Sequence, residues 1–295
     1  MNTRNKNILH VGLFFAMFAW GGSWINAKVL SSYINEFEML FLRFGITALS
    51  LVPILFYMRE SFKISLKSLG IAFFTSLFFI AYMKYFFIGT KYGTASLGGA
   101  FVTSLAPINT FLILAFLRIK SIGKKDYFAL FLGFLGVLTM LNVWSFDLNS
   151  ILVKHNLYFI LAAILWPFVT ILSSYASDTS PLTFSFYMYI ITCLLVLAFF
   201  VDMQDLNFEK FDSIFYLNLF TITILASTYA NSVYFLGVQK LGADGVSSFI
   251  FLVPFFAVLL GVVFLNEKLN LFVIIGAIMT LYAVKILNNI EFRKK

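Results

Sequence analysis

Charged residues are rare inside the long apolar stretches of this chain and gather between them. Eight stretches of 16 residues or more lack Asp, Glu, Lys and Arg: 7–27, 68–83, 92–117, 127–146, 156–177, 179–201, 213–239 and 245–266. The stretches 269–284 and 44–58 are almost as long. A bilayer core about 30 Å thick needs about 20 mostly apolar residues per helix. Because the runs are continuous and do not alternate, they predict transmembrane helices rather than barrel strands.

The expected spans are 8–27, 37–57, 67–89, 94–117, 126–143, 156–175, 181–201, 213–238, 244–265 and 269–287. The predicted fold class is therefore all-α, a polytopic membrane protein with ten transmembrane helices. Composition agrees, since 12% of residues are charged against about 25% in a soluble domain. No small-x-small cleavage site closes the first run, so we interpret it as a retained helix and not a signal peptide.

Basic residues are unevenly distributed between the two ends of the expected spans. Fourteen Lys and Arg flank one end and five flank the other, while Arg43 and Lys84 lie within spans. The positive-inside rule then places both termini in the cytoplasm, which requires an even number of spans. The net charge of +8 is thus explained by topology, and we do not expect nucleic-acid binding.

The two halves of the chain resemble each other in the order of their features. Residues 89–95 and 237–243 are similar glycine-containing segments, and Pro107 and Pro254 follow within the next spans. A charged span end lies 13 residues after each proline. Five spans per half is an odd number, so the halves would cross the membrane in opposite directions, as in many secondary transporters. We expect repeats at 1–150 and 151–295, although Gly and Pro are frequent in membrane helices in any case.

The chain resembles the drug/metabolite transporter superfamily, in particular its EamA-type ten-helix members. The resemblance covers nearly the whole chain and depends on the order of short motifs. These motifs are Trp20-Gly21-Gly22-Ser23, Leu42-Arg43-Phe44, 86–95, Leu105-Ala106-Pro107, 133–137, 236–243, Leu252-Val253-Pro254, 265–269 and Gly276. The family has a Glu at the end of both the fourth and the ninth span. Here Glu267 keeps the second, but Lys120 occupies the first position, so equivalent roles are not assumed.

The resemblance implies a carrier in the cytoplasmic membrane, with two inverted five-helix repeats around a central cavity. Such carriers move amino acids, other small metabolites or drugs, often outward. We therefore expect an amino-acid or metabolite exporter of the inner membrane that works by alternating access. A flippase-like carrier of lipid-linked or amphipathic molecules is the alternative, and it would need a laterally open cavity.

Lys84 is the sharpest candidate for chemistry, because ionisable groups at membrane depth are costly and usually face a wet cavity or a partner. It lies in an otherwise uncharged run beside Tyr82 and Tyr85. Its ammonium could hold an anionic substrate group, in which case Lys84→Met abolishes transport. The alternative is snorkelling, since Gly89 is only five residues away and the stem could reach the outer interface.

Arg43 and a set of aromatic and small polar residues are further candidates. Arg43 could gate the external mouth or serve as an interfacial anchor near Glu36. Breaks at Gly21-Gly22, Pro107, Pro167 or Pro254 would expose backbone groups that polar side chains, water or ligand must satisfy. Ordinary helix packing is the alternative for each residue. The substrate-binding candidates besides Lys84 are Trp20, Ser23, Trp24, Asn26, Tyr82, Tyr85, Thr103, Trp166, Phe168, Tyr229, Asn231, Tyr234 and Ser248, with Asn109 and Ser247 nearby.

The sequence shows no metal spacing, phosphate loop or nucleophile–base pair, so we expect no enzyme activity, no cofactor and no metal. The clear span interiors hold no Asp or Glu, although proton relays usually use a buried carboxylate. Proton coupling is therefore expected to be absent or weak, or to use a carboxylate near a span end or Lys84. The expected partners are a small-molecule substrate and the bilayer; a homodimer is compatible with the sequence, but a monomer is sufficient.

Overall fold

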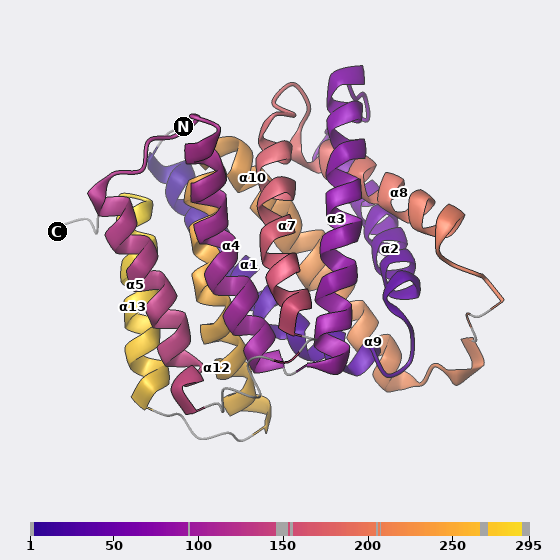
Figure 1. Ribbon diagram of the computed structural model, residues 1–295. Helices are drawn as coiled ribbons and strands as arrows, with labels where there is room; N and C mark the ends of the chain where they lie inside the picture. The colour runs from indigo at the N-terminus through magenta and orange to yellow at the C-terminus, as the bar shows by residue number, and fades with distance from the viewer. Residues whose placement is uncertain are drawn as a thin grey trace.

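The computed structural model describes residues 3–93, 95–145, 153, 156–204, 206, 208–265 and 271–290. Figure 1 shows the arrangement of the helices. In chain order the elements are α1 (Thr3–Leu30), α2 (Glu36–Tyr57), α3 (Leu66–Tyr92), α4 (Ala95–Phe116), α5 (Lys124–Met140), η1 (Val143–Ser145), α7 (Asn156–Ser174), α8 (Pro181–Phe199), η2 (Phe208–Lys210), α9 (Ser213–Thr221), η3 (Ile222–Asn231), α10 (Ser232–Leu241), α11 (Ala243–Ser248), η4 (Phe249–Leu252), α12 (Val253–Leu265) and α13 (Leu271–Leu287).

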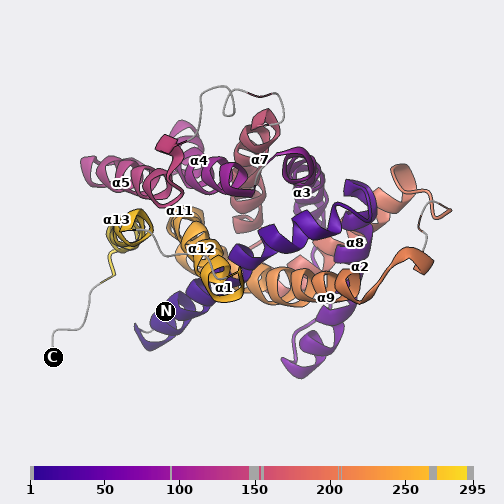
Figure 2. The same cartoon turned by 90° about the horizontal axis from the view of Figure 1, so that it is seen from below.

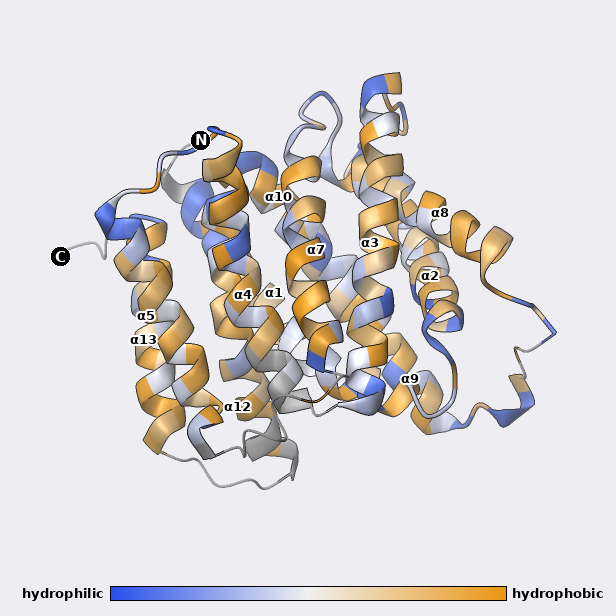
Figure 3. Cartoon of the chain, in the orientation of Figure 1, coloured by the Kyte–Doolittle hydropathy of each residue, from blue (hydrophilic) through white to orange (hydrophobic). Residues whose placement is uncertain are grey.

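These elements make ten membrane-spanning segments in the described residues, as the charge-free runs predict. The eighth and ninth segments are composite: α9, η3 and α10 together form the eighth, and α11, η4 and α12 together form the ninth. Seven of the described segments are long and apolar enough to cross a membrane by length and composition. Apolar residues follow the spans, and hydrophilic residues gather at the ends and in loops (Figure 3). The protein is therefore a multi-pass helical membrane protein.

Local polar residues define where several spans begin. At α2 the Asn35 side chain accepts hydrogen bonds from the backbone of Phe37 and Glu38, while Glu38 accepts one from the Asn35 backbone at 2.8 Å. This reciprocal capping box satisfies N–H groups that a helix start leaves without intrahelical partners. Ser180 caps α8 in a similar way, with Pro181 in the first turn, where proline costs no hydrogen bond.

The helix contacts repeat when the two halves are exchanged. The contact of α3 in the first half with α7 in the second corresponds to the packing of η3 and α10 in the second half against α1 in the first. In the same way, the α4–α7 contact corresponds to the packing of α12 against α1. Two contacts join equivalent helices of the two halves and are therefore unchanged by the exchange: α2 with α8, and α5 with α13. Figures 1 and 2 place α5 and α13 side by side at one edge of the bundle. This arrangement is a pseudo-twofold relation between five-helix halves. The boundary expected at 150 and 151 lies outside the described residues.

One end of the bundle carries the start of α1 and the end of α13, and we call it the termini end (Figure 1). Contacts between the halves gather there: Lys120 forms an ion pair with Asp244, and Lys125 donates a hydrogen bond to Asn289. Ser65 donates to Asp178 at 2.7 Å, and Ser68 donates to the same carboxylate. These two hydroxyls hold the pKa of Asp178 below its usual value. At the opposite end, the Tyr33 hydroxyl donates to Asp212 at 3.0 Å.

The predicted breaks are found at some of the expected places and not at others. The α1 helix continues through Gly21 and Gly22, so the expectation of a break there is wrong. Gly21 instead permits close packing, since a Cβ there would lie 2.8 Å from the Ala257 backbone nitrogen. Near Pro254 the span does depart from α-helix, as the 3₁₀ segment η4. A π-helical segment, η3, was not anticipated.

The α5–α13 contact depends on two facing glycines, Gly136 and Gly276. A Cβ built at Gly276 would lie 2.4 Å from the Gly136 carbonyl oxygen and 2.6 Å from the Met140 backbone nitrogen. Both neighbours are backbone atoms that cannot rotate away, so the two helices approach closely only because the side chain is absent.

We expect Gly276→Ala to lower the free energy of unfolding by about 1–3 kcal/mol, the usual cost of overpacking. The measurement is the melting temperature in detergent. The control is Gly70→Ala in α3, because no heavy atom lies within 4 Å of a Cβ built there. Equal melting temperatures for the two variants would contradict the close approach.

Candidate substrate-binding site

A pocket lies between the two halves, enclosed by residues of α1, α2, α3, α4, α7, η3, η4 and α12. Its lining residues are Trp20, Ser23, Trp24, Arg43, Tyr82, Met83, Phe86, Val102, Thr103, Ala106, Trp166, Asn231, Ile250 and Val253. The cavity volume is about 50 Å³. Since one water needs about 10–15 Å³ by this measure, the pocket has room for a few waters, and a larger ligand enters only if its walls move.

Arg43 provides a buried positive charge in this pocket. Its side chain is 3% exposed, its Nε donates to the Ser227 hydroxyl at 2.6 Å, and its Nη1 lies 3.9 Å from the Met83 sulfur. The guanidinium has five N–H donors, so these two contacts leave most of them without a strong acceptor. Among the described residues, no carboxylate lies within ion-pair distance of it. A buried cation at membrane depth usually marks a site for a ligand or an ion.

The π-helical segment η3 provides the residue that holds Arg43. In η3, the hydroxyls of Ser227 and Thr228 donate to the carbonyls of Ile222 and Thr223, five residues earlier. Single-turn π-helical distortions are frequent at functional sites. Here the wide turn directs Ser227 towards α2, where it accepts the Arg43 hydrogen bond.

Two tryptophans, one from each half, form the aromatic wall. The rings of Trp20 and Trp166 meet edge to face, with centroids 5.3 Å apart. Trp20 Nε1 donates to the Asn231 side chain at 2.9 Å and to the Ala226 carbonyl at 3.1 Å. Asn231 in turn donates to the Tyr189 hydroxyl at 2.8 Å. The indole of Trp20 is therefore held in place by η3 before any ligand binds.

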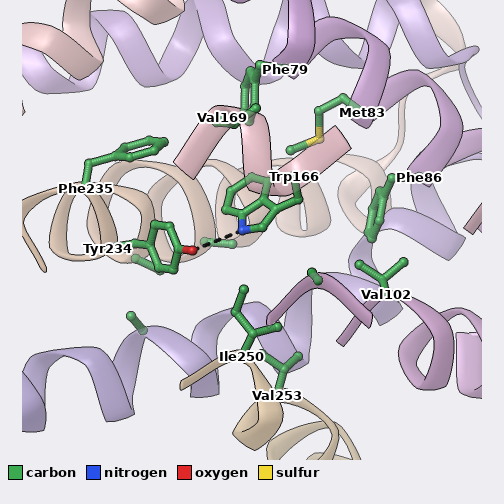
Figure 4. Close-up of a cluster of buried hydrophobic side chains, with 14 of the residues drawn as sticks. Phe79, Met83, Phe86, Val102, Trp166, Val169, Tyr234, Phe235, Ile250 and Val253 are labelled. Carbon is green, nitrogen blue, oxygen red and sulfur yellow. Dashed lines mark hydrogen bonds between the residues drawn. The ribbon is translucent and has the colours of Figure 1, made fainter. Parts of the chain in front are cut away.

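Trp166 is held by a second layer of residues. Its Nε1 donates to the Tyr234 hydroxyl at 3.2 Å, and that hydroxyl is also 3.0 Å from Thr170 Oγ1. Figure 4 shows Trp166 beside Met83 and Phe86 on one side and Tyr234 on the other. The Tyr82 ring lies 4.8 Å from the Trp166 ring. The pocket thus combines aromatic faces with one cation, an arrangement that suits a small molecule with an anionic group and an apolar part.

Many of the residues predicted from the sequence meet in the pocket. The residues that line it are Trp20, Ser23, Trp24, Arg43, Tyr82, Thr103, Trp166 and Asn231. Tyr234 lies behind Trp166 and is fully buried. Arg43 was expected near the external boundary. It lies deeper, seven residues or about 10 Å along α2 from its start, because α2 packs against η3 and α8 over this region.

Lys84 does not join the pocket, which corrects its expected placement. Its ammonium lies 5.6 Å from the centroid of the Phe37 ring, and the side chain is partly exposed. The helical position explains this, because Tyr82, Met83 and Phe86 present their face of α3 to the pocket while Lys84 points to another face.

Other predicted residues lie elsewhere and have local partners. Tyr85 stacks on Tyr158, and Phe168 stacks on Phe78. The remaining three residues make hydrogen bonds, namely Asn26 to Asn218 and Thr221, Tyr229 to the Gly12 carbonyl, and Ser248 to the Gly245 carbonyl and from Asn288. Glu267 lies outside the described residues.

Asn109 has a structural partner that follows from a proline. Pro167 lacks the N–H that would bond to the carbonyl of Ala163, four residues earlier. Asn109 Nδ2 of α4 donates to that carbonyl at 3.0 Å. The side chain therefore satisfies a backbone group freed by the proline in a region without water.

The sequence reasoning missed the apolar lining residues Met83, Phe86, Val102, Ala106, Ile250 and Val253. It also missed Ser227, the partner of Arg43. Apolar residues in a membrane span carry no signal that separates a pocket wall from a lipid face. No group of three or more His, Cys, Asp or Glu that could hold a metal occurs in the described part of the chain.

Ten spanning helices in two related halves, with a pocket between them, define a polytopic membrane protein of the transporter class. The model of the EamA-like transporter family matches residues 8–142 and 153–289. The chain belongs to this family, which is part of the drug/metabolite transporter superfamily.

Curated relatives match almost the entire chain. The uncharacterized transporter YyaM of Bacillus subtilis is 23% identical over 95% of this chain and 93% of its own length. An uncharacterized transporter of Archaeoglobus fulgidus is 24% identical over 93% of this chain and 95% of its own. A chloroplastic WAT1-related protein of Arabidopsis thaliana is 25% identical over 94% of this chain and 68% of its own.

A solved crystal structure shares the fold, with a TM-score of 0.76. Its sequence is 15% identical to this one, and the match covers 95% of this chain and 96% of the other. The likeness therefore concerns the fold alone.

We expect Arg43→Gln to weaken binding of any ligand that the pocket takes through an anionic group by about 10–100-fold, because charge-assisted hydrogen bonds contribute about 1.5–3 kcal/mol. The measurement is the ligand-induced shift in melting temperature across a panel of amino acids and carboxylate metabolites. Lys84→Met is the matched control and should bind normally. Weakened binding in Lys84→Met with normal binding in Arg43→Gln would instead assign the anion-binding role to Lys84.

Proposed function

We propose that the protein is a secondary transporter of small organic solutes with an anionic group, such as amino acids or related metabolites. The observation that supports this most is the Arg43 guanidinium, which lines a pocket between the halves with most of its donors unused. A carboxylate could bind to it through two parallel hydrogen bonds. The aromatic faces of Trp20 and Trp166 would contact the rest of the solute, and a solute ammonium could interact with them through cation–π attraction.

The proposed mechanism is alternating access about the pseudo-twofold axis. The pocket lies nearer the end opposite the termini, since Arg43 and Thr103 are each within about two turns of the start of their helices there. Side-chain contacts between the halves close the termini end. We place the termini end in the cytoplasm because it carries most of the basic residues. The membrane would be the inner membrane, and the outward direction rests on the family resemblance.

The transport proposal is tested by counterflow in liposomes against pooled amino acids and metabolites. We expect at least one carboxylate-bearing pool to exchange, with the exchange lost in Arg43→Gln. Flux should not require a proton gradient, because no Asp, Glu or His is among the pocket-lining residues. A strict dependence on the proton gradient would reject that part of the proposal.

The same assay separates the alternative classes. Movement of labelled lipid between leaflets, without exchange of soluble solutes, would favour a flippase-like carrier. Conversion of a solute into a new product would indicate an enzyme. Absence of all three activities in folded protein would contradict the transport proposal.

The Lys120–Asp244 ion pair leads to a prediction about how the termini end is kept closed. Both side chains are about one-quarter exposed, and exposed pairs contribute only about 0–1 kcal/mol to stability. We therefore expect Lys120→Asp to change the melting temperature little. In a Cys193→Ser background, the same substitution should speed thiol labelling of a Thr103→Cys reporter from the termini side several-fold.

The charge-swapped double variant, Lys120→Asp with Asp244→Lys, should restore slow labelling. Lys125→Ala is the control, because Lys125 contacts Asn289 at the same end but makes no ion pair among the described residues. Unchanged labelling in Lys120→Asp would show that this pair does not hold the end closed.

A further inference from the structure

A second, larger hollow lies on the outer side of the bundle, between the start of α1 and the end of α13. We call it the α1–α13 groove. Its lining residues are His10, Val11, Phe14, Phe249, Leu252, Ile278, Leu281, Tyr282, Val284, Lys285 and Ile290. Its volume is about 470 Å³ by the measure that gives about 50 Å³ for the pocket. Val11, Ile278 and Leu281 are exposed, so the groove opens towards the surrounding lipid.

The groove is apolar along most of its length and basic at one end. Lys285 lies in the last turn of α13, and Lys6 lies one turn before His10 on the same face of α1. Both positions are at the termini end. No Asp or Glu is among the lining residues that the structure describes. The basic groups therefore gather where the headgroup region of a bilayer meets the apolar groove.

His10 adds a buried ring nitrogen that has no hydrogen-bond partner in the described part of the chain. Its ring lies against Phe249, with centroids 5.7 Å apart, and its Nε2 is buried without a hydrogen bond to any described residue. A buried nitrogen in this state costs free energy unless a ligand or water satisfies it. A phosphate oxygen at the basic end of the groove would be a suitable acceptor for a hydrogen bond from His10 Nε2.

We propose that the α1–α13 groove binds one phospholipid with a net negative headgroup. An acyl chain fills the apolar part, and the phosphate lies among His10, Lys285 and Lys6. Each lysine near an anionic headgroup contributes about five-fold in affinity. A zwitterionic lipid gains less, because its own ammonium group is repelled by the same basic residues.

The bound lipid would touch the wall of the pocket. Phe249 and Leu252 line the groove, whereas Ile250 and Val253 line the pocket, so the η4 segment separates the two. The groove also joins α1 of the first half to η4 and α13 of the second. A lipid there contacts both halves next to the pocket.

The test is native mass spectrometry of detergent-purified protein with phosphatidylglycerol or phosphatidylcholine. We expect one phosphatidylglycerol molecule to be retained, in preference to phosphatidylcholine. Lys285→Gln should reduce that retention about five-fold. Lys63→Gln is the matched control, because Lys63 is exposed at the same end of the bundle but does not line the groove.

Ile278→Trp tests the acyl-chain part separately, since it fills the groove and leaves the basic residues unchanged. It should reduce retention of phosphatidylglycerol at an unchanged melting temperature. Equal retention of both lipids, or equal loss in Lys285→Gln and Lys63→Gln, would overturn the proposal. Dimers that disappear in Ile278→Trp would instead assign the groove to a second copy of the chain. Arg43→Gln should retain the lipid, so the result does not depend on the transport proposal.

Discussion

In the hydrocarbon core of a membrane no water is present to satisfy a polar group, so each must find its partner inside the protein. This constraint explains why Asn109 donates to the Ala163 carbonyl that Pro167 leaves free. It also explains why the hydroxyls of Ser227 and Thr228 bond back within the π-helical segment η3. Arg43 is different, because its contacts with Ser227 and Met83 leave most of its N–H donors without a strong acceptor.

The pocket is built where the symmetry of the fold brings equivalent residues together. Trp20 and Trp166 come from the first helix of each half, and their rings meet edge to face. The surroundings of the two rings differ, however. Trp20 is held by Asn231 and the Ala226 carbonyl, whereas Trp166 is held by Tyr234. The charge of the pocket is asymmetric too, because Arg43, the only cation among the described lining residues, comes from α2 of the first half.

The small size of the pocket fits a carrier that changes shape. A cavity of about 50 Å³ admits a few waters, so binding of a metabolite requires the walls to separate. At the termini end, the described residues of the two halves are joined by side-chain hydrogen bonds and by the Lys120–Asp244 ion pair. Such contacts are weak when partly exposed, so they can break and form again during the transport cycle.

The choice between Lys84 and Arg43 shows where sequence reasoning reaches its limit. Both are basic residues within spans, and Lys84 has the longer uncharged run around it. Which of them faces the pocket depends on the rotation of each helix about its axis, and that is decided by neighbouring helices. Ser227, 184 residues away in sequence, accepts the Arg43 hydrogen bond. No local sequence pattern around Arg43 predicts that contact.

The sequence by itself determined the ten spans, the all-α fold class and the existence of two related halves. These follow from the bilayer, whose thickness and lack of water act on every residue of a span alike and so leave a pattern that can be read along the chain. Tertiary structure alone decided which side chains share the pocket, which prolines and glycines alter a helix, and where η3 departs from α-helix. These outcomes depend on close contacts between distant segments, such as Gly136 with Gly276 and Arg43 with Ser227, and packing at that range has no periodic signature in the sequence.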